Sequence, residues 1–149
     1  LYLLDREPLE VSSRGESYLQ QGIEDVIFFT LRFSRRIMAH IHVSWLDPHK
    51  VRRLTVVGEK KMLVFDDLEK EKKAKIYETN YKEKRDHTVV TPVQELTEPL
   101  KLECLHFLEC LRERKEPLSS GRDGVRVLRV LEAAQESLKN LGRPIKIGA

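Results

Sequence analysis

Strands that follow one another with only short polar links constrain this fold more than any other feature of the sequence. Strand-like runs, several of them alternating apolar and polar side chains, occupy residues 9–18, 25–33, 37–45, 52–57, 61–65 and 74–77. Residues 88–93 are a candidate for one more edge strand. Because parallel strands need a crossover of about a dozen residues or more, these short links predict antiparallel pairing.

Two helical patterns come after the strands. Thr97 is expected to cap the first helix and Pro117 to end it. The second helix begins within 121–124 and ends at Gly142, and residues 145–147 are a candidate for a return to the sheet edge. Its buried stripe is expected to consist of Val127, Leu128, Leu131, Ala134 and Leu138.

Strands first and helices last predict an α+β fold. We expect an open, mainly antiparallel β-sheet of about six strands, with the two C-terminal helices packed on one face. A length of 149 residues suits one domain, so residues 1–149 are expected to form a single domain.

The start of the chain suggests a piece of a longer polypeptide. The first residue is Leu1, and residues 1–8 have the pattern of the last turn of a helix followed by its exit. The sequence contains neither a run of about 18 apolar residues nor a secretory signal, so we expect no membrane partner. Cys104 and Cys110 lack metal-ligand spacing and suit free thiols in a reducing compartment, so we expect a cytoplasmic location.

Charge argues against a nucleic-acid partner. The formal net charge is only +3, and lysines and arginines are mixed with acidic residues along most of the chain. The basic residues within 70–75 are interrupted by carboxylates and are typical of a solvated turn. A nucleic-acid-binding domain would concentrate its basic residues on one stripe, beside a recognisable motif.

Neither a nucleotide cradle nor a metal site is indicated. The seven glycines fit neither the G-x-G-x-x-G nor the G-x-x-x-x-G-K-[ST] pattern, so we expect this chain alone to bind no nucleotide cofactor. His40 and His42 are two residues apart on a predicted strand and therefore share a face. A zinc site needs a third and a fourth ligand, and of these the sequence offers only His49, past the turn, so polar residues on the less buried sheet face are the favoured interpretation.

The end of the strand 37–45 carries the densest set of candidate binding residues, namely Trp45, His49, Lys50 and Arg52. An aromatic ring followed by histidine, lysine and arginine suits an anionic ligand through charge-assisted hydrogen bonds. We regard these four residues as candidates for substrate binding or for an interface. The alternative is a surface turn with an ordinary charged hairpin.

One face of the predicted sheet is apolar where a face exposed to water should be polar. Val26, Phe28 and Met38 lie on this face, beside His40. Two helices are too few to cover both faces of such a sheet. We therefore expect part of this face to be an interface with another domain or another subunit.

Several segments resemble one protein family in the same order along the chain. They are DREP (5–8), GIEDV (22–26), AHIHVSWLDPHKVRR (39–53), TVVGEKK (55–61), DD (66–67), EPL (98–100), Phe107, DG (123–124) and VLEAAQES (130–137). Together they resemble the C-terminal domain of the Gfo/Idh/MocA oxidoreductases. The resemblance is closest to the branch that acts on nucleotide-linked sugars, such as UDP-N-acetylglucosamine 3-dehydrogenase.

The resemblance implies a two-domain enzyme in which an N-terminal Rossmann domain, absent from residues 1–149, binds NAD or NADP. The C-terminal domain would wall the cleft for a sugar or nucleotide-sugar substrate and form a homo-oligomer through its open sheet. The family's glycine fingerprint and its Glu-Lys-Pro and Asp-x-x-x-His motifs match no position here. The resemblance therefore implies no catalytic or cofactor-binding residue in this chain, which alone should be inactive. The alternative is a stand-alone module that dimerises through its sheet and has no catalytic activity.

Overall fold

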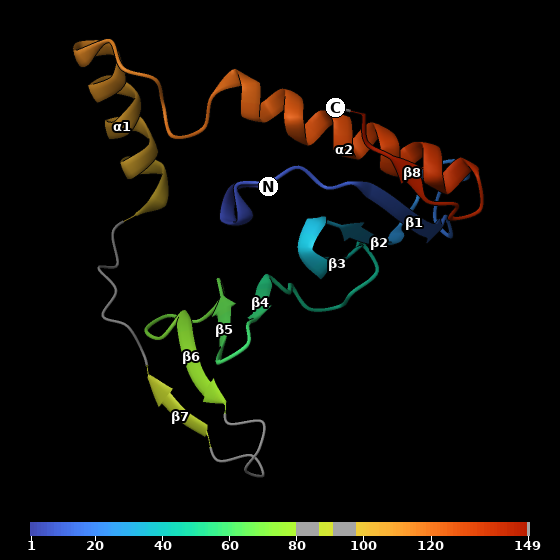
Figure 1. Cartoon of the computed structure of the whole chain (residues 1–149), viewed down its shortest axis with the longest axis horizontal. Coiled ribbons are helices and arrows are strands. Elements are labelled where there is room, and N and C mark those ends of the chain that lie inside the picture. The colour runs from blue at the N-terminus through green and yellow to red at the C-terminus, as the bar shows by residue number, and fades with distance from the viewer. Residues whose placement is uncertain (80–86, 91–97, 149) are drawn as a thin grey trace. The chain divides into compact units, whose positions relative to one another are not determined.

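A computed structural model describes residues 1–79, 87–90 and 98–148 (Figure 1). The chain forms two compact units. The first unit combines Leu1–Asp47 with Cys110–Ala149, and the second comprises Pro48–Glu109. The first unit is therefore built from both ends of the chain.

The first unit contains a four-stranded antiparallel sheet with the strand order β3-β2-β1-β8. Its strands are β1 (Glu10–Glu16), β2 (Val26–Arg32), β3 (Met38–Ser44) and β8 (Ile145–Lys146). In the register, Val11 lies opposite Leu31 and Phe28 lies opposite His42. Pairing of β8 with β1 at Ile145 confirms the expected return of the chain to the sheet edge.

Two short 3₁₀ turns flank these strands. The first, η1 (Tyr2–Leu4), fits the expected helical turn at the start of the chain. The second, η2 (Ser34–Arg36), connects β2 to β3, as the polar link between them predicts. Arg35 and Arg36 both have positive φ angles, which tighten this connection.

Helix α2 (Gly121–Lys139) covers one face of the first unit's sheet (Figure 1). Its start is fixed by a capping box, in which the hydroxyl of Ser120 and the carboxylate of Asp123 each accept a backbone hydrogen bond. The core beneath it is made of buried apolar residues from both layers, namely Val11, Leu31, Phe33, Val130, Ala133 and Ala134.

The buried stripe of α2 differs from the expected one. The helix buries Val130, Ala133, Ala134 and Ser137, and only Ala134 was expected among them. The expected residues Val127, Leu128 and Leu131 are exposed. The buried row includes Ala133, Ala134 and Ser137, whose small side chains allow the helix axis to approach the sheet closely, and the expected residues lie on the adjacent row.

The second unit contains another four-stranded antiparallel sheet, in the order β4-β5-β6-β7. Its strands are β4 (Arg53–Val57), β5 (Lys61–Asp66), β6 (Ala74–Thr79) and β7 (His87–Val90). Helix α1 (Pro99–Glu113) begins in this unit. The carboxylate of Glu98 accepts hydrogen bonds from the backbone N–H groups of Leu100 and Lys101 at the start of that helix.

The structure confirms the α+β class and the antiparallel pairing, and it divides the strands between two sheets. The two sheets are divided at the link between β3 and β4, which contains Pro48 and is too long for a tight hairpin. Beyond this link, β4 pairs with β5. Residues 91–93 of the candidate edge strand and the expected cap Thr97 lie outside the described residues. Within the described ranges, neither helix is long and apolar enough to cross a membrane.

Candidate functional site

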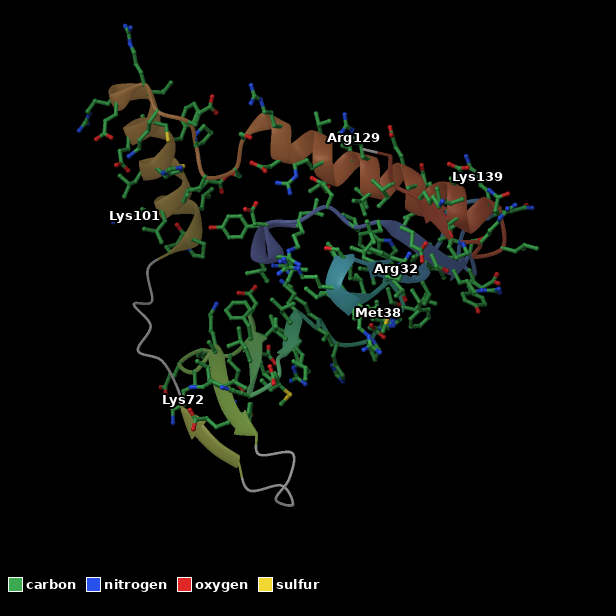
Figure 2. The ribbon with its side chains drawn as sticks, viewed as in Figure 1. Arg32, Met38, Lys72, Lys101, Arg129 and Lys139 are labelled. Atoms are coloured by element: carbon green, nitrogen blue, oxygen red, sulfur yellow. The ribbon has the colours of Figure 1, made fainter. Side chains whose placement is uncertain are left out.

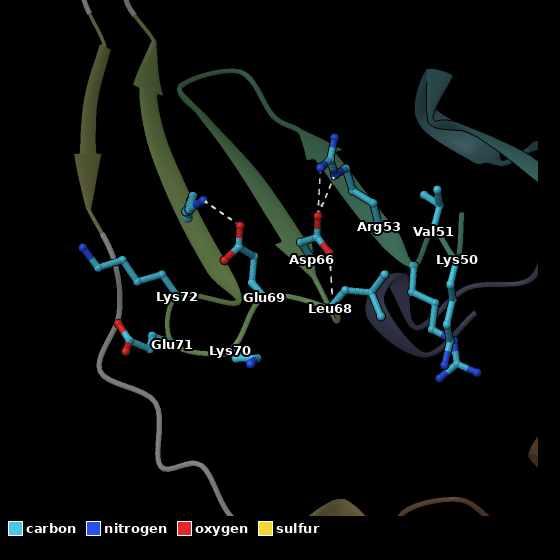
Figure 3. Close-up of a pocket in the computed structure, with 11 residues that line it drawn as sticks. Lys50, Val51, Arg53, Asp66, Leu68, Glu69, Lys70, Glu71 and Lys72 are labelled. Atoms are coloured by element: carbon cyan, nitrogen blue, oxygen red, sulfur yellow. Dashed lines mark hydrogen bonds and ion pairs between the residues drawn. The ribbon is translucent and has the colours of Figure 1, made fainter. Parts of the chain in front are cut away.

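A hollow lined mainly by charged side chains is the first candidate site. It lies in the second unit, has a volume of about 680 Å³, and is called the basic hollow below. Residues 50–53 at the start of β4 form part of its wall, together with Asp66, residues 68–72 and Lys75. Figure 3 shows Lys50 and Lys70 on separate sides of Leu68.

Backbone hydrogen bonds bring these distant segments together. The N–H of Asp67 donates to the carbonyl of Arg52 at 2.9 Å, and the N–H of Asp66 donates to the carbonyl of Lys73 at 2.8 Å. The register of the β4–β5 hairpin also places Arg53 opposite Asp66. The loop between β5 and β6 is therefore closed at its base and held beside the start of β4.

The carboxylate of Asp66 is occupied by partners within the hollow. Oδ2 accepts hydrogen bonds from Arg53 Nε at 3.2 Å and from Nη2 at 2.8 Å, and Oδ1 accepts one from the N–H of Leu68 at 3.1 Å (Figure 3). The bond from Arg53, followed by that from Leu68, lowers the pKa of Asp66. Asp66 therefore stays ionised and neutralises Arg53.

The neighbouring carboxylates are also engaged. Asp67 forms an ion pair with Lys73 at 3.0 Å and a longer one with Arg52 at 3.5 Å. The hydrogen bond from Lys73 is the main reason that the pKa of Asp67 is lowered. Glu69 Oε1 lies 3.8 Å from Lys75 Nζ. Asp66, Asp67 and Glu69 are therefore each paired with a basic side chain.

Positive charge remains in the hollow after this pairing. Its wall carries six basic residues and three acidic ones. Within the described part of the chain, Lys50, Lys70 and Lys72 form no ion pair with a carboxylate. Lysine ammonium groups and the Arg52 guanidinium are donors suited to anionic oxygens. These donors suit an anion, and among the residues that the structure describes the wall contains no histidine, serine or cysteine that could serve as a nucleophile.

The second candidate surface is the sheet face of the first unit that α2 leaves uncovered, called the open face below. Strand alternation places Val26, Phe28, Met38 and His40 on it together, as the sequence predicts. Met38 lies on the side of the sheet away from α2 and is 70% exposed (Figure 2). Phe28 is 43% exposed, and Val26 is half-buried.

Aromatic rings stack on the open face. The Phe28 and His42 rings are nearly parallel, with an angle of 10° between their planes and a centroid distance of 4.4 Å. His40 lies farther from Phe28, at 6.3 Å, and its Nδ1 is 3.3 Å from Thr30 Oγ1. No group of three histidine, cysteine or acidic side chains suited to a metal occurs among the residues that the structure describes.

The structure brings together only part of the binding set expected from the sequence. Lys50 and Arg52 line the basic hollow, whereas His49 is exposed and does not line it. Trp45 belongs to the first unit, and its side chain is exposed, with 82% of the residue's surface accessible. Its backbone N–H donates to the carbonyl of Asp25 at 2.8 Å.

Sequence reasoning missed the contribution of Lys70, which lies in a loop expected to be a solvated turn. The available signal was the pair Asp66 and Asp67 just before this loop. Asp66 pairs with Arg53, and Asp67 pairs with Arg52 before the loop and Lys73 after it, so these contacts hold the loop beside Arg52 and Arg53.

Comparison with known proteins places these sites in context. The family model described as oxidoreductase family, C-terminal alpha/beta domain (GFO_IDH_MocA_C) matches residues 1–147. A search of curated proteins gives no match.

Solved structures of three oxidoreductases share the fold at low sequence identity. Aldose-aldose oxidoreductase from Caulobacter crescentus, complexed with glycerol, has a TM-score of 0.78 and 23% identity, over 97% of this chain and 43% of that one. UDP-N-acetylglucosamine 3-dehydrogenase from Acidithiobacillus ferrooxidans has a TM-score of 0.79 and 17% identity, over 92% and 42% of the two chains. Levoglucosan dehydrogenase, in complex with NADH and L-sorbose, has a TM-score of 0.78 and 13% identity, over 95% and 45%. This chain therefore spans less than half the length of these proteins.

Proposed function

The chain belongs to the Gfo/Idh/MocA oxidoreductase family as its C-terminal alpha/beta domain, and from this premise we propose that it serves an NAD(P)-dependent dehydrogenase of nucleotide-linked sugars. The observation that carries the proposal is the family match across residues 1–147. Residues 1–149 would serve as the domain that walls the substrate cleft, in a cytoplasmic enzyme.

The substrate class is supported by the similar structures and by the basic hollow. The three similar structures are named as oxidoreductases of sugars or sugar derivatives. One of them is named for a UDP-linked sugar, UDP-N-acetylglucosamine. Lys50 and Arg52 line a hollow with surplus positive charge, which suits the anionic part of such a substrate. Trp45 and His49 are proposed as further cleft or interface residues.

The residues of this chain do not fit a dinucleotide cofactor. A pyrophosphate cradle needs a glycine-rich turn between a strand and a helix. Gly121 and Gly124 open α2, but they form no such fingerprint and no strand immediately precedes them. We therefore propose that NAD or NADP binds a Rossmann domain elsewhere in the complete enzyme. A nicotinamide bound there would supply the hydride acceptor for oxidation of a sugar hydroxyl.

The open face is proposed as the self-association surface. It exposes Met38 and Phe28 beside His40 and Val26, and α2 covers the opposite face of the sheet. An exposed apolar area on a sheet favours contact with another chain. The same observation supports the alternative function, a dimerisation module without catalytic activity.

The test begins with the coding sequence upstream of Leu1. A strand followed by G-x-G-x-x-G is expected there, and the encoded protein should reduce NAD or NADP in the presence of UDP-N-acetylglucosamine or a related nucleotide sugar. Free sugars and a reaction without sugar serve as controls. Absence of the fingerprint, with no reduction in any of these reactions, would contradict the dehydrogenase proposal and favour the dimerisation module.

A further inference from the structure

We propose that the basic hollow of the second unit is a phosphate-binding site, in which Lys50, Arg52 and Lys70 hold the diphosphate of the ligand. The inference rests on the proposed function, because a nucleotide-linked sugar is a ligand that would bring a diphosphate to this domain. It assigns that diphosphate to named residues of this chain.

The first argument is the balance of charge. Asp66 neutralises Arg53, Glu69 lies beside Lys75, and Asp67, which lies outside the wall, binds Lys73 more closely than Arg52. Glu71 is the remaining carboxylate of the described wall. Lys50 and Lys70 keep their charges unpaired among the described residues of the chain. Anionic oxygens entering the hollow would therefore meet donors that are not already bound to carboxylates.

The second argument is that the fold positions these donors. Lys50 and Arg52 precede β4, whereas Lys70 comes from the loop after β5. The hydrogen bonds of Asp66 and Asp67 to the carbonyls of Lys73 and Arg52 hold these two segments side by side. Donors that are far apart in the sequence therefore line the same hollow in the absence of a ligand.

The third argument concerns which ligand the hollow fits. Its volume of about 680 Å³ is within the range of ligand sites, about 300–1,000 Å³. Val51 and Leu68 are the only apolar side chains among the described residues of its wall, so an uncharged apolar ligand would find few partners. Stretches of single-stranded nucleic acid are usually held by aromatic stacking, and the described wall contains no aromatic residue.

Isothermal titration calorimetry with inorganic pyrophosphate tests the site directly. The unsubstituted chain should bind pyrophosphate, with an affinity that falls as salt is added. The double variant K50A/K70A should bind about tenfold more weakly or worse, since each substitution removes a charged donor. Circular dichroism should show that this variant is folded, because both side chains are exposed and unpaired in the described structure.

A charge-matched control is available on α2. Figure 2 shows Arg129 and Lys139 on that helix, in the first unit. The variant R129A/K139A loses two positive charges, as K50A/K70A does, and should bind pyrophosphate as the unsubstituted chain does. Equal weakening in both variants would show that only net charge matters, and would overturn the site.

Competition identifies the source of the phosphate. UDP should displace pyrophosphate, whereas orthophosphate should compete more weakly because it offers fewer anionic oxygens. No binding of pyrophosphate, no competition by UDP, or binding of a single-stranded oligonucleotide in place of pyrophosphate would each overturn the inference. Reduction of NAD or NADP with a nucleotide sugar, in a protein that does not bind pyrophosphate, would overturn this inference alone. Pyrophosphate binding in a complete protein that reduces neither NAD nor NADP would contradict the proposed function instead.

Discussion

The backbone N–H of Ser13 on β1 donates a 2.9 Å hydrogen bond to Ser137 Oγ on α2. That hydroxyl in turn donates to the carbonyl of Arg143 at 2.7 Å, in the segment that leads to β8. Both serines are buried, Ser137 completely. A single hydroxyl therefore joins the sheet, the helix and the final strand of the first unit.

Ser137→Ala should destabilise the first unit by about 1–3 kcal/mol, because it leaves the buried N–H of Ser13 without its acceptor. Ser13→Ala is the matched comparison. The hydroxyl of Ser13 is buried and has no hydrogen-bond partner in the described structure, so its removal should cost little or be stabilising. Urea unfolding followed by circular dichroism measures both, and similar losses in the two variants would contradict the assigned bonding.

Gly15→Ala should destabilise the first unit by about 1–3 kcal/mol, through steric crowding. A Cβ at this position would lie 2.7 Å from the carbonyl oxygen of Val26, which is backbone and cannot move aside easily. Gly124→Ala is the control in the first turns of α2, where a Cβ meets nothing within 4 Å. It should stabilise by up to about 1 kcal/mol through helix propensity. Thermal unfolding of both variants measures the contrast, and a stabilising Gly15→Ala would refute this packing.

Acidification should weaken the second unit through Asp66. Its folded-state pKa is lowered by Arg53, so its stabilising contribution is present above the ordinary carboxyl pKa of about 4 and is lost as the pH falls through the lowered value. Asp66→Asn should therefore be less stable than the unsubstituted chain at pH 7, and the difference should shrink below about pH 4.

Urea unfolding at a series of pH values measures this difference. Asp47→Asn is the control, because Asp47 is an exposed carboxylate with no hydrogen bond or ion pair in the described structure. Its difference from the unsubstituted chain should stay small throughout. A stability difference for Asp66→Asn that does not change with pH would contradict the role of the ion pair.

Phe28→Lys should weaken self-association more than it weakens folding, because it places a charge in the middle of the open face. Val125→Lys is a control of similar exposure, 49% against 43%, on the helix that covers the opposite face. Sedimentation velocity over a range of concentrations measures the change. A chain that is monomeric at high concentration before any substitution would rule out this surface as the interface of the chain.

The sequence predicted the strands and helices of this fold better than the contacts between them. Alternation along β2 and β3 identified both strands and correctly grouped Phe28 with Met38, because strand geometry fixes which side chains share a face. The buried stripe of α2 was harder to predict, since helical spacing alone does not show which of two adjacent rows of side chains faces the sheet. The row that meets the sheet includes Ala133 and Ser137, whose small size, and not their hydrophobicity, allows close packing.

The basic hollow could be predicted only in part, for a related reason. Lys50 and Arg52 formed a visible cluster beside a turn, but the contribution of Lys70 depends on how the loop after β5 folds back. That fold depends on ion pairs of Asp66 and Asp67 with residues on both sides of the loop. Such pairs between distant residues leave no periodic pattern in a sequence.

The pairing of β1 with β8 has a consequence for how the protein is made. The two buried serines that join β1 to α2 are 124 residues apart, and β8 comes later still. The first three strands leave the ribosome before the helix and strand that complete their core. Until then, the bare edge of β1 and the uncovered apolar face can pair with other nascent chains. The first unit therefore completes its core only once α2 and β8 have been translated, and its early strands have to avoid pairing with other chains until then.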